Sequence, residues 1–177
     1  YDKNLDDKKD KKMKLNDELK ALLNAQVNME IEAAYQYKAM SAYFEGRELE
    51  GFAKWMDAQV QEELGHSKKF YDYLLKREGK IEYFELNKPK ADFSSVKEVF
   101  EVALAHEQKV TASIENIYKV ARNLGDFGVE NFLDFFIEEQ EEEEETVKKI
   151  IDKITLLNVD NKNVELYLLD KEMGERK

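Results

Sequence analysis

Four long stretches of this chain repeat apolar residues every three or four positions. They span about residues 15–44, 49–78, 95–124 and 126–157, and Gly46, Gly79 and Gly125 punctuate their ends. This spacing is typical of helices that bury one face. The 177 residues contain one proline, so few positions interrupt a helix. The pattern predicts an all-α fold built from four helices of about 30 residues each.

The lengths of the connections predict how these helices are arranged. The first and third connections are short, so each joins an antiparallel helical hairpin. The middle connection, residues 80–93, lacks a clear period and contains Pro89. About 15 extended residues span roughly 50 Å, whereas a 30-residue helix is roughly 45 Å long. We therefore expect an antiparallel four-helix bundle with one long crossover between helices two and three. Residues 164–173 predict a short fifth helix at the C-terminal end.

The composition limits which binding partners and which cellular compartment we expect for this protein. Residues 1–12 are almost wholly polar, and we expect a disordered extension or the remnant of a leader or tag before one domain, 13–177. No apolar run is long enough for a membrane span, and no signal peptide is visible, which favours a cytoplasmic protein. The absence of cysteine excludes disulfides and thiolate metal sites. A formal charge of −11 argues against nucleic acid and favours metal cations, although acidity also simply promotes solubility.

Polar residues interrupt all four apolar stripes near their midpoints. The interrupting side chains are Glu30 in the first stripe, Glu63 and His66 in the second, Glu107 in the third, and Gln140 and Glu143 in the fourth. A buried carboxylate without a counter-charge costs several kcal/mol or stays protonated. Four carboxylates in one core would repel each other unless they shared metal ions. Oxygen ligands with one imidazole suit iron, and a Glu-x-x-His pair on one helix face is typical of di-iron proteins.

Each interrupting residue also has a simpler interpretation. A lone Glu-x-x-His pair usually lies on a solvated surface, and Tyr37 alone is more often a core residue. Gln140 alone could make an ordinary buried hydrogen bond. The coincidence across four helices is what favours a metal centre. The acidic run 138–145 is usually a solvated face, yet Glu139 and Glu142 lie near the inward direction. His106 lies beside its stripe and is expected to be solvated.

The motifs together resemble the ferritin family, specifically its haem-free prokaryotic type. The matching segments are 28–32, 61–66, 106–108 and 139–143, and the resemblance covers about residues 13–171. It implies that Glu30, Glu63 and His66 hold one iron. It further implies that Glu63 bridges to a second iron held by Glu107 and Glu143. Gln140 and Tyr37 would lie beside that pair, and the residues implied for a third iron are Glu62, Glu139, Glu142 and Glu143.

Departures from related families refine the resemblance. Bacterioferritin and rubrerythrin carry a second Glu-x-x-His pair on helix four, where this chain has Gln140 and Glu143. The chain also lacks the cysteines of the iron domain that rubrerythrin often adds. Leu64 occupies the position of the methionine that binds haem in bacterioferritin, so haem is not expected.

The resemblance implies an iron-storage protein with ferroxidase activity. Fe²⁺ would be oxidised by O₂ or H₂O₂ at the buried di-iron centre, and ferric oxyhydroxide would be deposited inside a homo-oligomeric cage of 24 subunits. Two other functions remain open from the sequence. One is a structural or partner-binding bundle without metal, and the other is a di-iron oxidase that acts on an organic substrate.

Overall fold

Six helical elements form the part of the chain that the structure describes, residues 14–176 of a computed structural model. They are α2 (Asp17–Glu45), α3 (Glu50–Lys76), α4 (Val96–Leu124), α5 (Phe127–Leu157), the 3₁₀ helix η1 (Val159–Asn161) and α6 (Asn163–Met173). These bounds lie within a few residues of the predicted helices. The expected polar extension, 1–12, lies outside the described residues.

Local capping explains where the long helices begin. The side chains of Asn16, Ser95 and Asp126 each accept a hydrogen bond from a backbone N–H in the first turn that follows. Each cap satisfies a donor that has no partner inside the helix. Glu98 does not complete a capping box with Ser95, because its carboxylate accepts bonds from the N–H and hydroxyl of Ser94 instead.

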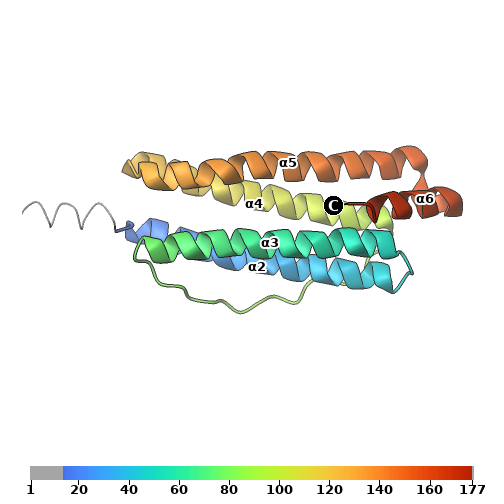
Figure 1. Cartoon of the computed structure of the whole chain (residues 1–177), viewed down its shortest axis with the longest axis horizontal. Helices are drawn as coiled ribbons and strands as arrows, with labels where there is room; N and C mark the ends of the chain where they lie inside the picture. Colours follow the sequence, from blue (N-terminus) through green and yellow to red (C-terminus); the bar gives the residue numbers. More distant parts are fainter. Residues whose placement is uncertain (1–13, 177) are drawn as a thin grey trace, which may run out of the picture.

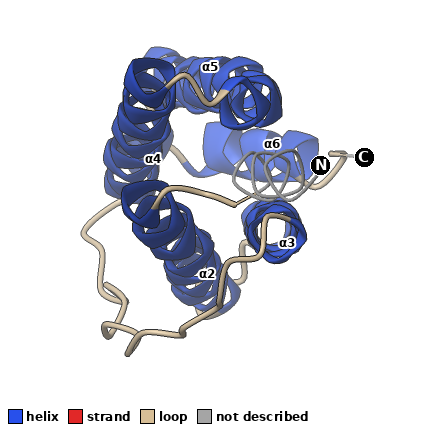
Figure 2. Cartoon of the chain, turned by 90° about the vertical axis from the view of Figure 1, so that its left-hand side faces the viewer, coloured by secondary structure: helices blue, strands red, loops and turns tan. Residues whose placement is uncertain are grey.

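The bundle consists of two antiparallel hairpins, α2–α3 and α4–α5, as Figure 1 shows. The crossover, residues 77–95, runs along the outside of the bundle from the end of α3 to the start of α4. Helix α6 packs at one end, against α3 (Figures 1 and 2). The predicted fold is thereby confirmed. No described helix has the length and apolar character that crossing a membrane requires.

Side-chain amides on α2 hold the crossover in place. Asn24 donates to the carbonyl oxygen of Glu82 and accepts from its N–H, at 3.0 and 2.9 Å. Asn28 contacts the same carbonyl and accepts from the Phe84 N–H, and Gln36 makes the same pair of bonds with Lys90. These amides give the extended backbone the partners that a neighbouring strand would supply elsewhere.

The apolar core is divided into two clusters along the bundle. One cluster contains Phe44, Phe52 and Phe100 and occupies the end nearest α6. The other contains Leu19, Phe70 and Leu133 and occupies the opposite end. Every long helix contributes to both clusters, and the polar residues of its stripe fall in the gap between them. The fold therefore places one polar layer in the middle of the bundle.

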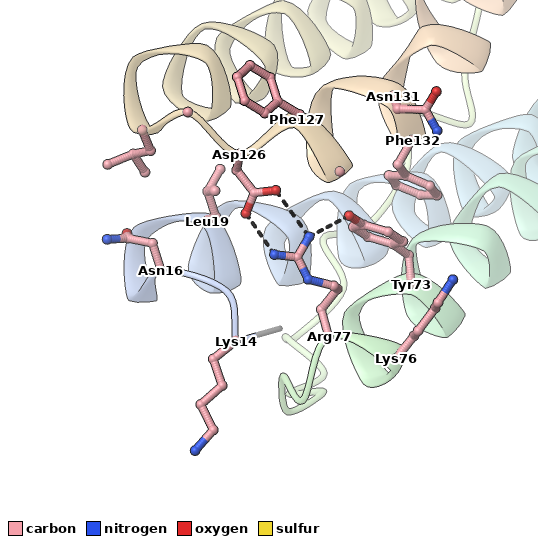
Figure 3. Close-up of a pocket in the computed structure, with 13 residues that line it drawn as sticks. Lys14, Asn16, Leu19, Tyr73, Lys76, Arg77, Asp126, Phe127, Asn131 and Phe132 are labelled. Carbon is pink, nitrogen blue, oxygen red and sulfur yellow. Dashed lines mark hydrogen bonds and ion pairs between the residues drawn. The ribbon is translucent and has the colours of Figure 1, made fainter. Parts of the chain in front are cut away.

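The end of the bundle that lies far from α6 contains a cavity of about 760 Å³ (Figure 3). Arg77 crosses it, donating to both carboxylate oxygens of Asp126 at 2.8 and 3.1 Å and to the Tyr73 hydroxyl at 2.7 Å. These bonds tie the end of α3 to the turn between α4 and α5. None of the predicted metal ligands lines this cavity, so we assign it a structural role.

Candidate metal centre

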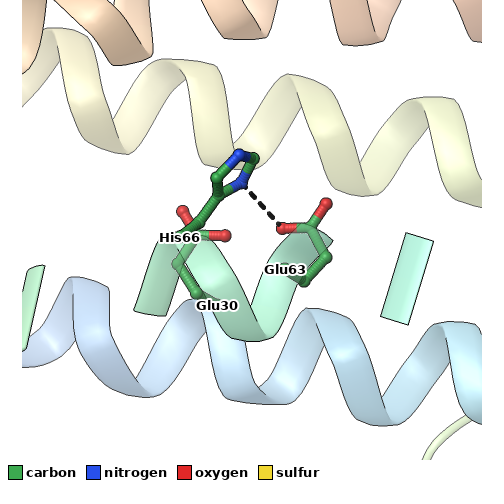
Figure 4. Close-up of side chains that lie close together, drawn as sticks. All are labelled: Glu30, Glu63 and His66. Carbon is green, nitrogen blue, oxygen red and sulfur yellow. Dashed lines mark ion pairs between the residues drawn. The ribbon is translucent and has the colours of Figure 1, made fainter. Parts of the chain in front are cut away.

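Glu30, Glu63 and His66 come together in the polar layer (Figure 4). One potential ligand atom from each residue lies within 4.8 Å of the other two, and all three side chains are buried. His66 Nδ1 lies 3.5 Å from Glu63 Oε2. Glu63 and His66 are one turn apart on α3, and Glu30 faces them from α2, so two helices supply this half of the centre.

A hydrogen-bond chain orients Glu30. Gln26, one turn earlier on α2, donates from Nε2 to Glu30 Oε1 at 2.9 Å. The Ser113 hydroxyl on α4 donates to Gln26 Oε1 at 2.6 Å, which fixes the direction of the Gln26 amide. One oxygen of Glu30 is thus held, while the other remains directed into the centre.

The α4–α5 hairpin supplies the other half of the centre. Tyr37 donates to Glu107 Oε1 at 2.7 Å, and Gln140 Nε2 donates to Glu107 Oε2 at 3.1 Å. Gln59 Nε2 donates to Glu143 Oε2 at 3.0 Å. The donors that orient both carboxyl groups are therefore neutral and bring no positive charge into the centre.

Burial and mutual repulsion favour protonated carboxyl groups in the metal-free centre. Burial, and then the charge of Glu63, raise the pKa of Glu30 well above its ordinary value. Burial and the charge of Glu107 do the same to the pKa of Glu63, and they raise the pKa of Glu143 to about 8. Burial also raises the pKa of Tyr37, beside Glu107, so the phenol stays protonated.

Several atoms of this layer lack a hydrogen-bond partner among the described residues. They are Glu30 Oε2, both carboxylate oxygens of Glu63, His66 Nδ1, and the amide oxygens of Gln59 and Gln140. Buried polar atoms without partners are rare and costly. Almost all of these atoms carry a lone pair that can coordinate a metal ion. Such atoms attract a cation and repel an anion. The residues present therefore fit a metal centre of oxygen ligands and one imidazole.

A second acidic cluster adjoins the centre. Glu62, Glu139 and Glu143 each offer a carboxylate oxygen within 4.8 Å of the other two. His66 Nε2 lies 3.5 Å from Glu139 Oε1. Glu143, which Gln59 orients in the polar layer, links this cluster to the centre. Glu142, which the resemblance included here, is exposed and is not part of this group.

From the sequence we assigned no role to Gln26 and Gln59, and we expected His106 to be solvated. Gln26 and Gln59 are fully buried and bond to Glu30 and Glu143. Their position four residues before Glu30 and Glu63, inside the apolar stripes, was the available signal. The expectation that His106 is solvated holds only in part, because the residue is half-buried. Its Nε2 atom is inaccessible, burial lowers its pKa, and residues 87–89 of the crossover line a small cavity beside it.

Comparison with known proteins identifies the family of this chain. Residues 20–157 match the family model described as a ferritin-like domain. This chain belongs to the ferritin family. A bacterial non-heme ferritin of Staphylococcus epidermidis is 40% identical over 162 residues, which cover 92% of this chain and 96% of that protein. A bacterial non-heme ferritin of Staphylococcus aureus is 38% identical over 154 residues, covering 87% and 92%.

Solved ferritin structures have the same fold. An open-pore ferritin from the hyperthermophilic archaeon Archaeoglobus fulgidus superposes with a TM-score of 0.89 at 34% identity, covering 92% of this chain and 98% of that one. A humanized archaeal ferritin gives a TM-score of 0.89 at 36% identity, with the same coverage. The prediction of a haem-free prokaryotic-type ferritin is confirmed.

Proposed function

We propose that this ferritin stores iron by oxidising Fe²⁺ at the buried centre and depositing ferric oxyhydroxide inside a closed homo-oligomer. The observation that carries the proposal is the convergence of buried carboxylates from all four long helices, with several oxygens lacking partners. Iron is the substrate of this reaction. Two Fe²⁺ ions give up one electron each, and O₂ takes both electrons and two protons to become H₂O₂; alternatively, H₂O₂ is the oxidant.

The ligand roles follow the geometry of the two halves. Glu30 and His66 would hold one iron, and Glu107 and Glu143 the other. Both carboxylate oxygens of Glu63 lack hydrogen bonds among the described residues, which supports Glu63 as the bridge between the two irons. Carboxylate ligands suit this chemistry because their charge stabilises Fe³⁺ more than Fe²⁺.

Proton release accompanies metal binding in this mechanism. The raised pKa values of Glu30, Glu63 and Glu143 mean that these groups carry protons when the centre is empty. A cation must displace those protons, so binding strengthens as the pH rises. Tyr37 and Gln140 keep the Glu107 carboxylate oriented throughout, because neither donor changes its charge.

The second acidic cluster is the proposed third iron position. It shares Glu143 with the centre, and Glu139 contacts His66 on the side away from Glu63. Glu62 and Glu139 are partly exposed, whereas Glu143 is buried, so we expect weaker binding and faster exchange of the cation there. This position would pass ferric iron from the centre toward the stored mineral.

The relatives and neighbours are named as non-heme and archaeal ferritins, which supports a haem-free, homo-oligomeric protein. We propose a cage of 24 subunits located in the cytoplasm. With a subunit mass of 20.8 kDa, this cage has a mass of about 500 kDa. Size-exclusion chromatography measures this directly, and a monomer or dimer would contradict the cage.

Replacing two ligands tests the site assignment. Glu63→Ala combined with His66→Ala should abolish rapid Fe²⁺ oxidation at two Fe²⁺ per subunit, while the assembled species stays intact. The matched control is Leu64→Ala, because Leu64 lies between the two ligands but is 43% exposed. Stopped-flow absorbance of the ferric product measures the rate. Oxidation at the original rate in the double variant would refute the assignment.

A further inference from the structure

The C-terminal end of the described chain is fixed against the start of α3. A side-chain carbon at Gly51 would lie 1.7 Å from the Asp170 carbonyl oxygen, so only glycine permits this approach. The Asp170 carboxylate also accepts a hydrogen bond from the Phe52 N–H at 2.9 Å. The chain then turns back from α6 toward the middle of the bundle (Figure 1). Residues 174–176, which we call the C-terminal arm, therefore have a defined position.

Arg176 anchors this arm to α3 through three contacts. Its Nη2 donates to Glu62 Oε1 at 2.9 Å, and its Nη1 donates to the Trp55 carbonyl oxygen at 3.3 Å. The guanidinium carbon lies 4.6 Å from the centroid of the Trp55 ring. The Arg176 side chain is 22% exposed and that of Glu62 is 41% exposed, so water reaches this ion pair.

Glu62 is therefore shared between two partners. It belongs to the acidic cluster with Glu139 and Glu143, and it is also the only carboxylate to which Arg176 is bonded among the described residues. A carboxylate oxygen that accepts from a guanidinium cannot offer the same lone pair to a metal. The fixed positive charge also repels an arriving cation.

We propose that Arg176 gates the third metal position by competing with the cation for Glu62. The inference rests on the proposed function of that cluster. While the third metal position is empty, Arg176 neutralises Glu62 and holds the C-terminal arm against Trp55. A divalent or trivalent cation that binds Glu62, Glu139 and Glu143 displaces the guanidinium and releases the arm. Because linkage is reciprocal, whatever holds the arm down weakens cation binding by the same factor.

The expected effect is modest because the contacts are accessible to water. Partly exposed ion pairs and cation–π contacts each contribute little free energy, so removing Arg176 should tighten the third position by roughly three- to tenfold. This size suits a position that must bind and release iron repeatedly. Trp55 is the only tryptophan of the chain, so its fluorescence reports the state of the arm.

Anaerobic calorimetric titration of the assembled protein with Zn²⁺, which has no redox chemistry, measures the equivalents bound per subunit. Arg176→Ala should tighten the third equivalent, while the two tighter equivalents serve as an internal reference. Lys149→Ala is the matched control. Lys149 lines a cavity together with Trp55 and Arg176 and pairs with Glu145, so its loss removes an equal charge without freeing Glu62. Equal affinities in the two variants, or weaker binding in Arg176→Ala, would overturn the gate.

Trp55 emission gives a second readout. In the unaltered protein the emission should shift as the third equivalent binds, and Arg176→Ala should show the shifted emission before any Zn²⁺ is added. Glu139→Gln, which removes a ligand but leaves Arg176 in place, should abolish the shift. A third equivalent that leaves Trp55 emission unchanged refutes the gate, whereas failure to bind the first two equivalents refutes the proposed function instead.

Discussion

The two acidic clusters lie side by side and share Glu143, yet they differ in their access to water. Glu30 and Glu63 are 0% exposed, whereas the Glu62 side chain is 41% exposed and that of Glu139 is 25% exposed. In the buried centre, protons neutralise the carboxylates when no metal is bound, which the raised pKa values of Glu30 and Glu63 reflect. In the exposed cluster, Arg176 and solvent compensate the charge.

This contrast indicates two kinds of cation binding. The buried centre has fixed ligands, excludes water and must exchange protons for metal, so its affinity is high and depends on pH. The exposed cluster has a mobile counter-charge and screening by water, so its affinity is lower and its exchange faster. In the proposed function, burial, and not the number of carboxylates, separates the oxidation site from the transfer site.

Removing one ligand from each cluster tests this division most strongly. Glu30→Ala should slow oxidation of the first two Fe²⁺ per subunit by at least about 100-fold, because a ligand of the centre is lost. Glu62→Ala should slow only the additions beyond those two. Stopped-flow absorbance at increasing Fe²⁺-to-subunit ratios distinguishes the phases. Equal slowing of the first phase in both variants would show that the clusters act as one site.

The stability of the metal-free protein should depend on pH through its buried carboxyl groups. A carboxyl whose pKa is raised by folding stabilises the protein fully below its ordinary pKa. That contribution is lost as the pH rises through the raised value, which is about 8 for Glu143. We expect the thermal midpoint of the metal-free protein to fall by about 5–10 °C between pH 5 and pH 8.

Differential scanning fluorimetry in the presence of a chelator measures this slope. Glu143→Gln should flatten it, because the amide cannot ionise, and Glu138→Gln is the control on the exposed face of the same helix. Zn²⁺ should reverse the slope by replacing the lost protons with a cation. A midpoint that rises with pH in the metal-free protein would contradict the raised pKa values.

The sequence predicted a residue's position best where that position follows from the periodic pattern of the helix that contains the residue. Periodicity and caps predicted the four long helices, and polar breaks in the apolar stripes predicted the residues that the structure brings together, including Glu30, Glu63 and His66. It failed where the role depends on a segment without periodicity. His106 shares a small cavity with residues 87–89 of the crossover, and Arg176 reaches Glu62 across 114 residues of chain. Neither contact can be recognised from the residues that neighbour it in the sequence.

The smallest expected effect concerns the neutral donors of the buried centre. Tyr37→Phe removes the 2.7 Å hydrogen bond to Glu107 Oε1 and leaves a buried carboxylate oxygen without that donor. Loss of such an orienting partner typically costs 10- to 100-fold, and Gln140 still holds the other oxygen, so we expect oxidation to slow by about tenfold. Tyr35→Phe is the matched control, since Tyr35 is 45% exposed.

Calorimetry on the same two variants shows which property the hydroxyl supports. If Tyr37 only orients Glu107, Tyr37→Phe should still bind two tight Zn²⁺ equivalents per subunit with slightly weaker affinity, while its oxidation rate falls. Equal oxidation rates in Tyr37→Phe and Tyr35→Phe would mean that Glu107 is positioned by Gln140 and packing alone. The contrast between the clusters would then rest on burial, without a contribution from the neutral hydrogen bond of Tyr37.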